Sequence, residues 1–448
     1  MSWKKDYMPL IRLIIPLVLT GMIGGLVYFF ETAFLAHLGP EALAAGALVS
    51  WLYGLFVVVI YGILGSVNIL VAFAYGQKNT EKIMHVVRDG LILALLLFIP
   101  SFVLFWNMAP IFLFLGQKPH LIVIATPYLK ALAWGLCPAF FLAALLEPMI
   151  GLAKIRIIMV FTGINVLTTI VLSYFLIFGI YPFPNLGVAG AGWGISLSSS
   201  ITLILLLITL YFSNDYHPYF FRIFNIKQPF YIMELVHIGL PMGLMYCVEV
   251  GFFFAMTIVI GTYGHELLAA NQIALQYLGV LIGAIFSIAQ AITVRIGHLL
   301  GARKVDDAKK VAVLGIQIAV GFICFFSILD CFFPNQLIAM DFDIDNPKYH
   351  QMIHYAKQFL WMAGIFQILE AIRVSLFGAL RALKDTRFTL VCSFITFWCI
   401  GLPLGILFEI KFNLHGLGLW LGLSISVLIS IYWLWKHFIN RMKFYSHD

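Results

Sequence analysis

The sequence contains few charged residues and no long polar segment. Only 10% of its 448 residues are Asp, Glu, Lys or Arg, whereas 62% are hydrophobic, and the mean hydropathy is +1.00. This composition lies far outside the usual range for a soluble globular domain. We therefore interpret the chain as an integral membrane protein.

Several chemical motifs are also missing. The six cysteines form no C-x-x-C or Cys/His metal spacing, and all of them lie within apolar runs, so we expect buried small hydrophobes and neither disulfides nor zinc. The sequence has no G-x-S-x-G or H-E-x-x-H motif, which argues against a hydrolase, and no Walker-type loop, which excludes an ATP-driven pump. We expect that the protein is not an enzyme. The first apolar stretch is too long for a cleavable signal peptide, so it should remain as the first membrane helix.

Apolar segments long enough to cross a bilayer make up most of the chain. A membrane-spanning helix needs about 20 apolar residues, and the runs are continuous and do not alternate every second residue, which favours helices over barrel strands. The sequence therefore predicts an all-α membrane protein with twelve transmembrane helices, near residues 9–37, 43–75, 89–115, 121–150, 155–180, 187–213, 234–263, 267–300, 308–334, 350–378, 387–410 and 414–438.

The second half of the chain repeats the first. With a shift of 225 residues, Pro16 aligns with Pro241 and Gly39 with Gly264; with a shift of 227, Trp134 aligns with Trp361. This pattern indicates two copies of a six-helix unit. We predict an N-terminal lobe at 1–213, a cytoplasmic linker at 214–233 and a C-terminal lobe at 234–448. Because six is even, both lobes insert the same way up, which predicts a pseudo-twofold axis along the membrane normal.

The basic residues are distributed unequally between alternate loops. Loops on the side of the N-terminus hold 20 of the 27 Lys and Arg residues, whereas the opposite side holds only Lys118, Lys130, Lys348, Lys357 and Lys411. The positive-inside rule then places both termini in the cytoplasm. The net charge of +7 is explained by this orientation and does not indicate nucleic-acid binding.

Ionisable residues inside the predicted spans require an explanation, because each costs about 2.5–3.5 kcal/mol on insertion scales. Six lie well inside the spans: Glu31, Glu147, Glu249, Arg295, Glu370 and Arg373. A low dielectric favours the neutral carboxyl, and an approaching cation favours the carboxylate. A buried acid can thus hold a proton, a sodium ion or a cationic substrate, but only one of them at a time, as an antiporter requires.

The individual acids allow different interpretations. Glu249 and Glu370 are expected to face each other inside the C-terminal lobe as a cation site. The alternatives are that Glu249 is a protonated acid satisfied by a neighbouring helix and that Arg373 simply pairs with Glu370 along the helix. Glu31 is interpreted either as a second ion site or as a packing or gating carboxylate.

Glu147 is expected to form a structural ion pair with Lys154 or Arg156. For Arg295 we expect a structural role, with its side chain reaching the interface or capping carbonyls.

Aromatic and Met residues flank these acids and could form an adaptable wall for flat apolar cations. They are Phe29, Phe30, Met245, Tyr246, Phe252, Phe253 and Phe366. Most Phe residues in such a chain nevertheless face lipid or pack between helices, and this alternative stays open for each of them.

Several motifs resemble those of the multidrug and toxic compound extrusion (MATE) family over nearly the whole chain. They are Glu31-Thr32, the segments 39–45, 269–274, 295–301 and 378–387, and Leu240-Pro241 followed by Glu249. The acids at Glu249 and Glu370 are similar to those of the NorM-type and eukaryotic branches. This resemblance implies two lobes of six helices and export of organic cations in exchange for sodium or protons.

The sequence departs from the family pattern at several positions. The family usually has Asp at the position of Glu31, NorM types usually have Asp at that of Glu370, and Tyr commonly stands at that of Phe366. On the fifth helix, Thr169 and Ser173 replace an Asn and an Asp or Asn. At these positions the resemblance therefore implies neither a particular coupling ion nor an ion site in the N-terminal lobe.

We therefore predict a secondary active multidrug exporter of the inner cell membrane that exchanges amphipathic organic cations for protons, with sodium as the alternative ion. The expected partners are small organic cations and membrane lipid, without nucleic acid, and we expect a monomer without cofactor. A lipid-linked saccharide flippase is the alternative function, but its cavity would need cationic side chains for pyrophosphate. The residues predicted to bind substrate or ion, with a possible sodium at the first two, are Glu249, Glu370, Glu31, Tyr246, Gln272, Phe366 and Arg373.

Overall fold

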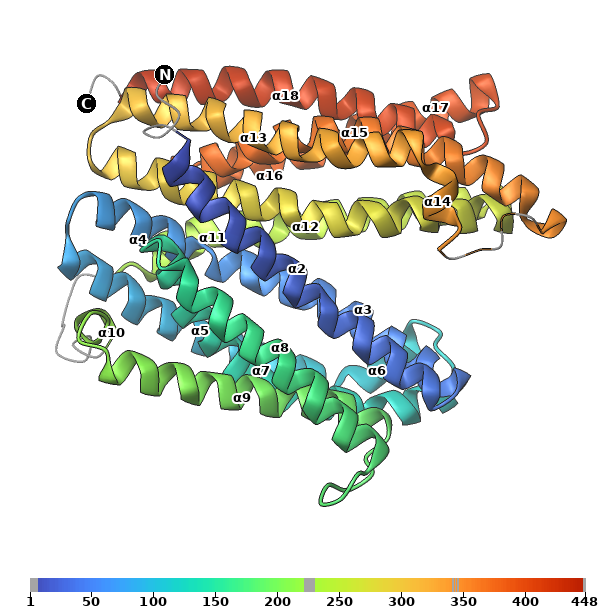
Figure 1. The fold of residues 1–448 in the computed structure, drawn as a ribbon, viewed down its shortest axis with the longest axis horizontal. Helices are drawn as coiled ribbons and strands as arrows, with labels where there is room; N and C mark the ends of the chain where they lie inside the picture. The colour runs from blue at the N-terminus through green and yellow to red at the C-terminus, as the bar shows by residue number, and fades with distance from the viewer. Residues whose placement is uncertain (1–6, 221–229, 341, 343, 345, 446–448) are drawn as a thin grey trace. The chain divides into compact units, whose positions relative to one another are not determined.

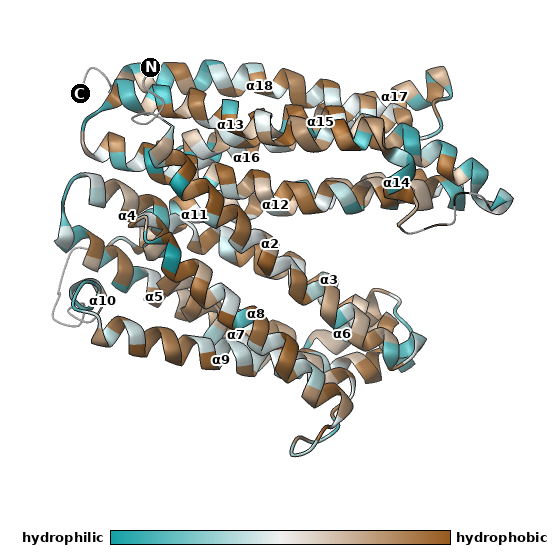
Figure 2. Ribbon diagram, in the orientation of Figure 1, coloured by the Kyte–Doolittle hydropathy of each residue, from teal (hydrophilic) through white to brown (hydrophobic). Residues whose placement is uncertain are grey.

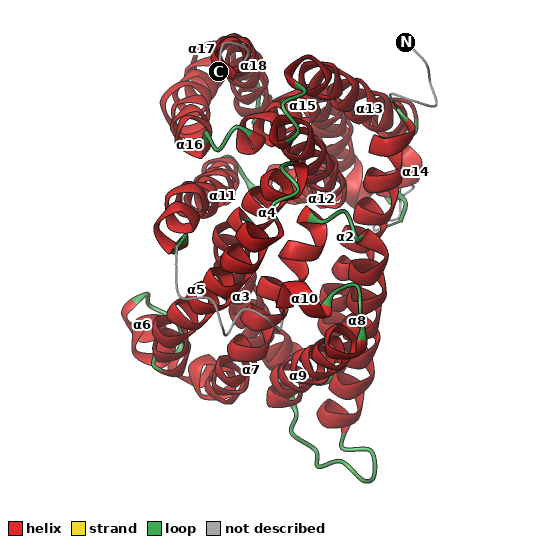
Figure 3. Ribbon diagram, turned by 90° about the vertical axis from the view of Figure 1, so that its left-hand side faces the viewer, coloured by secondary structure: helices red, strands yellow, loops and turns green. Residues whose placement is uncertain are grey.

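The computed structural model describes residues 7–220, 230–340, 342, 344 and 346–445. This part of the chain is helical, with turns and loops between the helices (Figures 1 and 3). Twelve of its helical segments are long and apolar enough to cross a membrane, which confirms the predicted all-α membrane fold. Along these helices hydrophobic residues predominate, and hydrophilic residues gather toward helix ends and loops (Figure 2).

The first six spans occupy the N-terminal half. They are α2 (Met8–His37), α3 and α4 together (Pro40–Leu64 and Ser66–Gly76), α5 (Thr80–Trp106), α7 (Pro119–Gly151), α8 (Ile155–Phe178) and α9 (Val188–Phe212), with short helices α6 (Met108–Phe114) and α10 (His217–Phe220) between them.

The second six spans follow in the same order. They are α11 (Ile232–Gly261), α12 (His265–Gly301), α13 (Val305–Phe332), α15 (His350–Ala382), the segment α16–η3–α17 and α18 (Leu417–Tyr445). The fifth of these runs as α16 (Thr386–Phe394), a π-helical stretch η3 (Ile395–Gly401) and α17 (Leu402–Phe412). Two short elements, α14 (Pro334–Ile338) and the 3₁₀ turn η2 (Pro347–Tyr349), precede α15.

Gly39 and Gly264, which the repeat aligns, have backbone conformations that favour glycine. Gly39 precedes α3 with φ of 107°, and Gly264 precedes α12 with φ of 138°. Residues with a Cβ rarely adopt such angles, so both copies of the repeat use glycine to turn into their second span. Pro40 then occupies the first turn of α3, where no backbone N–H is needed.

The helices form two compact units. One comprises Leu19–Gly243, and the other comprises Leu244–Asp448 together with Met1–Val18. The first turns of α2 and α11 are therefore grouped with the opposite halves of the sequence. In the segment predicted as a linker, α10 and the start of α11 are helical, and residues 221–229 lie outside the described part.

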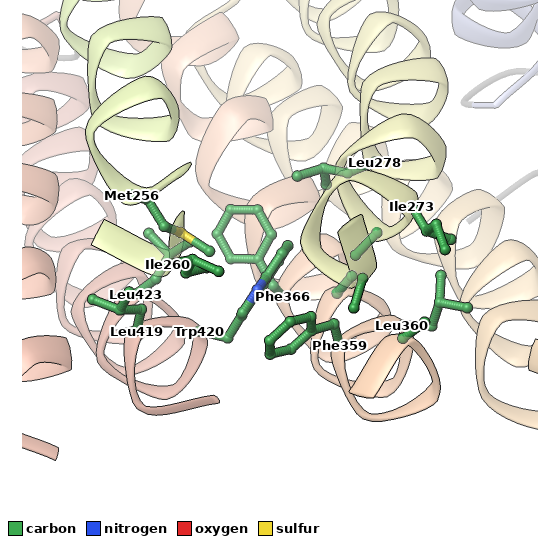
Figure 4. Close-up of a cluster of buried hydrophobic side chains, with 14 of the residues drawn as sticks. Met256, Ile260, Ile273, Leu278, Phe359, Leu360, Phe366, Leu419, Trp420 and Leu423 are labelled. Atoms are coloured by element: carbon green, nitrogen blue, oxygen red, sulfur yellow. The ribbon is translucent and has the colours of Figure 1, made fainter. Parts of the chain in front are cut away.

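An apolar core fills the unit that contains Leu244–Asp448. Side chains of α11, α12, α15 and α18 contribute to it, and Figure 4 shows Phe366 and Trp420 among them. The Trp420 indole donates to Asn271 Oδ1 of α12 over 3.1 Å, so its polar edge is satisfied inside the core. This packing fixes α15, which carries the principal charged residues of the unit.

Candidate functional site

Three charged side chains meet inside the unit that contains Leu244–Asp448. Glu370 and Arg373 lie one turn apart on α15, and Glu249 comes from α11. Arg373 Nε and Nη2 lie 2.8 and 2.5 Å from the two carboxylate oxygens of Glu370, and Nη2 also lies 2.9 Å from Glu249 Oε1. Arg373 thus bridges both acids, and we call these three residues the acid–arginine cluster.

Neighbouring residues fix the guanidinium. Arg373 Nη1 donates to Ser393 Oγ over 3.1 Å, and the same hydroxyl donates to Glu249 Oε1 over 3.0 Å. The rings of Phe377 and Phe397 lie 4.6 and 4.7 Å from the guanidinium carbon. Phe397 belongs to the π-helical stretch that begins two residues after Ser393, and such irregular turns often occur at functional sites.

The charges of the acid–arginine cluster do not balance. Arg373 is fully buried, and Glu370 and Glu249 are only 1% and 7% exposed. With both acids ionised, two negative charges face one positive charge in a medium of low dielectric. An uncompensated buried charge is costly, so the cluster favours uptake of one further positive charge, which a proton, a metal ion or an organic cation can supply.

The other residues predicted for this site differ in their burial and in the residues that they contact. Tyr246, one turn before Glu249, packs its ring against Phe286 and lies 5.4 Å from the Arg381 guanidinium. Phe366, one turn before Glu370, is fully buried in the apolar core against Phe253 and Trp420. Gln272 is on the exposed face of α12, next to the buried Asn271. The structure therefore places Phe366 in the core, and among the described interactions none joins Gln272 to the acid–arginine cluster.

In the unit Leu19–Gly243, Glu31 is a separate buried acid. It is 4% exposed, and its Oε1 has no hydrogen-bond partner in the described residues. The hydroxyls of Tyr28, Tyr53 and Tyr128 lie near enough for electrostatic interaction with it.

The two polar positions on α8 are also buried. Thr169 Oγ1 donates to the backbone carbonyl of Asn165 over 2.7 Å, whereas Ser173 Oγ has no partner in the described residues. These positions supply one satisfied and one unsatisfied hydroxyl, and whether they form an ion site stays a prediction.

The predicted ion pair of Glu147 is wrong. Its Oε2 accepts a hydrogen bond of 2.6 Å from Asn68 of α4, and in the described residues it forms no salt bridge with Lys154 or Arg156. Lys154 lies instead over the ring of Tyr216. The difference arises because α7 presents Glu147 toward α4, a direction that sequence distance to a basic residue does not reveal.

Two further expectations concern residues outside the acid–arginine cluster. Arg295 is partly exposed and interacts electrostatically with Asp307 of α13. Of the six cysteines, Cys392 is buried as predicted, but Cys247 and Cys399 lie on exposed faces of the helices.

Sequence reasoning missed three buried acids, namely Asp89, Asp330 and Glu409. Asp89 pairs with Arg88 at 2.8 Å and accepts the backbone N–H of Tyr231, so it holds the start of α11. Glu409 accepts the backbone N–H of Gly416 over 2.9 Å in the turn between α17 and α18. Both carboxylates hold the backbone where another helix begins, at Tyr231 before α11 and at Gly416 before α18, and a sequence pattern does not reveal such contacts.

Comparison with known proteins agrees with this architecture. A sequence model of the MatE family matches residues 16–175 and 241–407, which is most of both halves. The chain belongs to the MATE family. Members are membrane transporters, and this MATE protein is therefore a transporter and not an enzyme.

Named relatives of this MATE chain cover nearly its full length. It is 31% identical over 434 residues to the probable multidrug resistance protein NorM of Bacillus cereus, covering 95% of this chain and 94% of that protein. It is 28% identical to the protein of the same name from Brucella suis, over 96% of this chain and 93% of the relative. Among solved structures, an outward-facing multidrug resistance MATE transporter has a TM-score of 0.90 at 18% identity, covering 98% of this chain and 96% of that one. This likeness supports the fold alone.

Proposed function

We propose that this MATE protein exports amphipathic organic cations across the inner cell membrane in exchange for protons. The observation that carries the proposal is the acid–arginine cluster, in which Arg373 neutralises one of two buried carboxylates and leaves one negative charge in excess. The NorM names of its relatives support a role in multidrug efflux.

The excess charge provides a mechanism of exchange. An organic cation that enters from the cytoplasm neutralises the excess negative charge, and a proton that enters from outside neutralises it in turn. Because only one positive charge is needed, occupancy by proton and by drug is mutually exclusive. Protonation from outside then weakens the attraction for the drug and favours release. Each ligand shifts the conformational equilibrium by its differential affinity for the two states.

Protons are favoured over sodium at this cluster by the ligands available. A sodium ion needs several oxygen ligands, whereas here both oxygens of Glu370 and Oε1 of Glu249 already accept from Arg373. The flanking Phe366 contributes no oxygen. A proton needs only one carboxylate oxygen, so it is the simpler coupling ion at this position.

A flippase for lipid-linked saccharides is the weaker alternative. Recognition of a pyrophosphate requires free cationic side chains, but the guanidinium of the fully buried Arg373 is engaged by two carboxylates and Ser393. The acid–arginine cluster thus has the wrong sign of excess charge for an anionic lipid.

The charge of the exported compound tests the proposal. In bacterial cells that lack their own drug exporters, expression of the chain should lower the accumulation of a fluorescent organic cation and leave that of an anionic dye of similar size unchanged. Cells with an empty vector provide the control. Equal effects on both dyes, or an effect on the anionic dye alone, would refute export of cations.

A further inference from the structure

A second buried acid lies apart from the acid–arginine cluster. Asp330, in the last turn of α13, is 3% exposed, and in the part of the chain that the structure describes it forms no ion pair. Its Oδ2 accepts one hydrogen bond of 3.2 Å from Gln367 Nε2. A single neutral donor compensates poorly for burying a carboxylate, so this acid requires a further positive charge.

The packing of α13 against α15 brings other oxygen atoms close to Asp330. α13 and α15 run antiparallel, because Ser327 Oγ donates to the Gly364 carbonyl over 2.9 Å while Trp361 Nε1 donates to the Cys331 carbonyl over 3.0 Å. Side chains on a helix lean toward its N-terminus. Asp330 and Gln367, each one turn beyond the Ser327–Gly364 contact on its own helix, therefore lean toward each other and toward that contact.

Gly364 provides room for this arrangement. A Cβ at this position would lie 3.3 Å from Cys331 Sγ, 3.5 Å from the Ser327 carbonyl oxygen and 3.7 Å from Asp330 Cβ. Glycine thus leaves open the small volume beside Asp330 that a Cβ would occupy.

One of these polar groups lacks a partner. Gln367 is fully buried, and its Oε1 has no hydrogen-bond partner, although the Nε2 of the same amide contacts Asp330. An unsatisfied buried acceptor costs roughly 1–3 kcal/mol. A ligand between the two helices that is itself positive would satisfy Gln367 Oε1 and the Asp330 carboxylate together.

We propose that Asp330, Gln367 and Ser327 form a binding site for a sodium ion. The site offers a carboxylate, an amide oxygen and a hydroxyl from two facing helices, with the Gly364 carbonyl beside them, and such hard oxygen ligands suit small hard cations. One negative charge on Asp330 matches one monovalent cation. In the acid–arginine cluster, in contrast, both oxygens of Glu370 and one oxygen of Glu249 already accept from Arg373.

The position of this sodium site relates it to transport. Gln367 lies one turn from Glu370 on α15, so occupancy at Asp330 changes the charge felt by the acid–arginine cluster. The site extends the proposed function without depending on it, because sodium binding is measured with neither drug nor gradient present.

Binding of ²²Na⁺ to the purified protein tests the site directly. We expect saturable binding to the wild type that Asp330→Asn weakens at least tenfold, because asparagine keeps the shape and the contact with Gln367 but removes the charge. Gln367→Met, which removes Oε1 at similar size, should weaken binding as well. Asp306→Asn, at the exposed start of the same helix, is the matched control and should bind as the wild type does.

Three results would overturn the proposal. They are absence of saturable ²²Na⁺ binding to the folded wild type, unchanged affinity in both Asp330→Asn and Gln367→Met, and loss of binding in Glu370→Gln with full binding in Asp330→Asn. Melting curves of each variant show that it is folded. A misfolded Asp330→Asn leaves Gln367→Met and the wild type to decide.

Discussion

At the scale of single residues, Arg373 controls the state of the two acids in the acid–arginine cluster. It contacts both carboxylates, Ser393 and two aromatic rings while being fully buried. Its bidentate contact with Glu370 fixes the geometry and leaves Glu249 with a single Arg373 contact and the Ser393 hydroxyl. In the proposed mechanism, Glu249 is therefore the acid that we expect to be freed for a proton or a substrate.

Glu249→Gln should abolish export and leave the protein folded in the membrane. The amide keeps the size of the side chain and an oxygen that accepts from Ser393, but it cannot exchange a proton or carry the excess negative charge. Export of a fluorescent cation from cells, normalised to the amount of protein in the membrane, measures the effect. Glu41→Gln is the control, because Glu41 is an exposed acid paired with His120. Export by Glu249→Gln at the wild-type rate would make Glu249 a packing residue.

Arg373→Gln should destabilise the protein at neutral pH. The variant leaves two buried carboxylates face to face without a cation, and loss of one partner of a buried ion pair costs about 3–5 kcal/mol. Acidification supplies the missing protons, so the difference in melting temperature between the variant and the wild type should shrink as the pH falls. Melting curves at several pH values check this, and a difference that is constant or that grows at low pH would show that the charges are not the cause.

At the scale of helices, the close contact of α12 and α15 depends on Gly378, which the repeat aligns with Gly151. A Cβ on Gly378 would overlap the Ala289 carbonyl oxygen, and the Thr293 hydroxyl donates to the Gly378 carbonyl over 2.7 Å. In the other unit, a Cβ on Gly151 would lie 2.7 Å from the Asn68 carbonyl oxygen. Both copies of the repeat thus use a glycine at the same helix contact.

Gly378→Ala should lower stability by on the order of 1–3 kcal/mol, since overpacking forces the two helices apart. Gly283→Ala is a suitable control, because this glycine lies within α12 and its Cβ would meet no atom within 4 Å. Alanine there removes backbone freedom of the unfolded chain and should be neutral or slightly stabilising. Equal melting temperatures for both variants would contradict the importance of this contact.

The helices and the principal acids could be predicted from sequence because long apolar runs and charges inside them are strong signals. The packing of the helices against one another could not be predicted from the sequence. Asp330 lies near the end of its apolar run, where an acid usually faces water, and only the antiparallel contact of α13 with α15 shows that it is buried. The place of Phe366 one turn from Glu370 predicts a position beside the acids, whereas its ring packs into the core, which is the alternative left open for each Phe. Which way a side chain faces depends on the helices packed around its own helix, and a single sequence does not identify those helices.

At the scale of the whole molecule, the distribution of basic residues predicts the orientation in the membrane. Single cysteines at Lys118 and Lys304, both exposed, would test it in a background without native cysteines. A membrane-impermeant thiol reagent added to intact cells should label position 118 and should label position 304 only after the cells are opened. The reverse pattern would invert the topology and place the termini outside.

The coupling ion is decided most directly with the purified protein in vesicles, where a sodium gradient and a pH gradient are imposed separately at clamped membrane potential. If the acid–arginine cluster exchanges a proton for an organic cation, a pH gradient alone will drive uptake of a fluorescent cation into inverted vesicles. Glu249→Gln will abolish that uptake. Uptake driven by a sodium gradient at equal pH, with none driven by a pH gradient, would contradict proton exchange at this cluster.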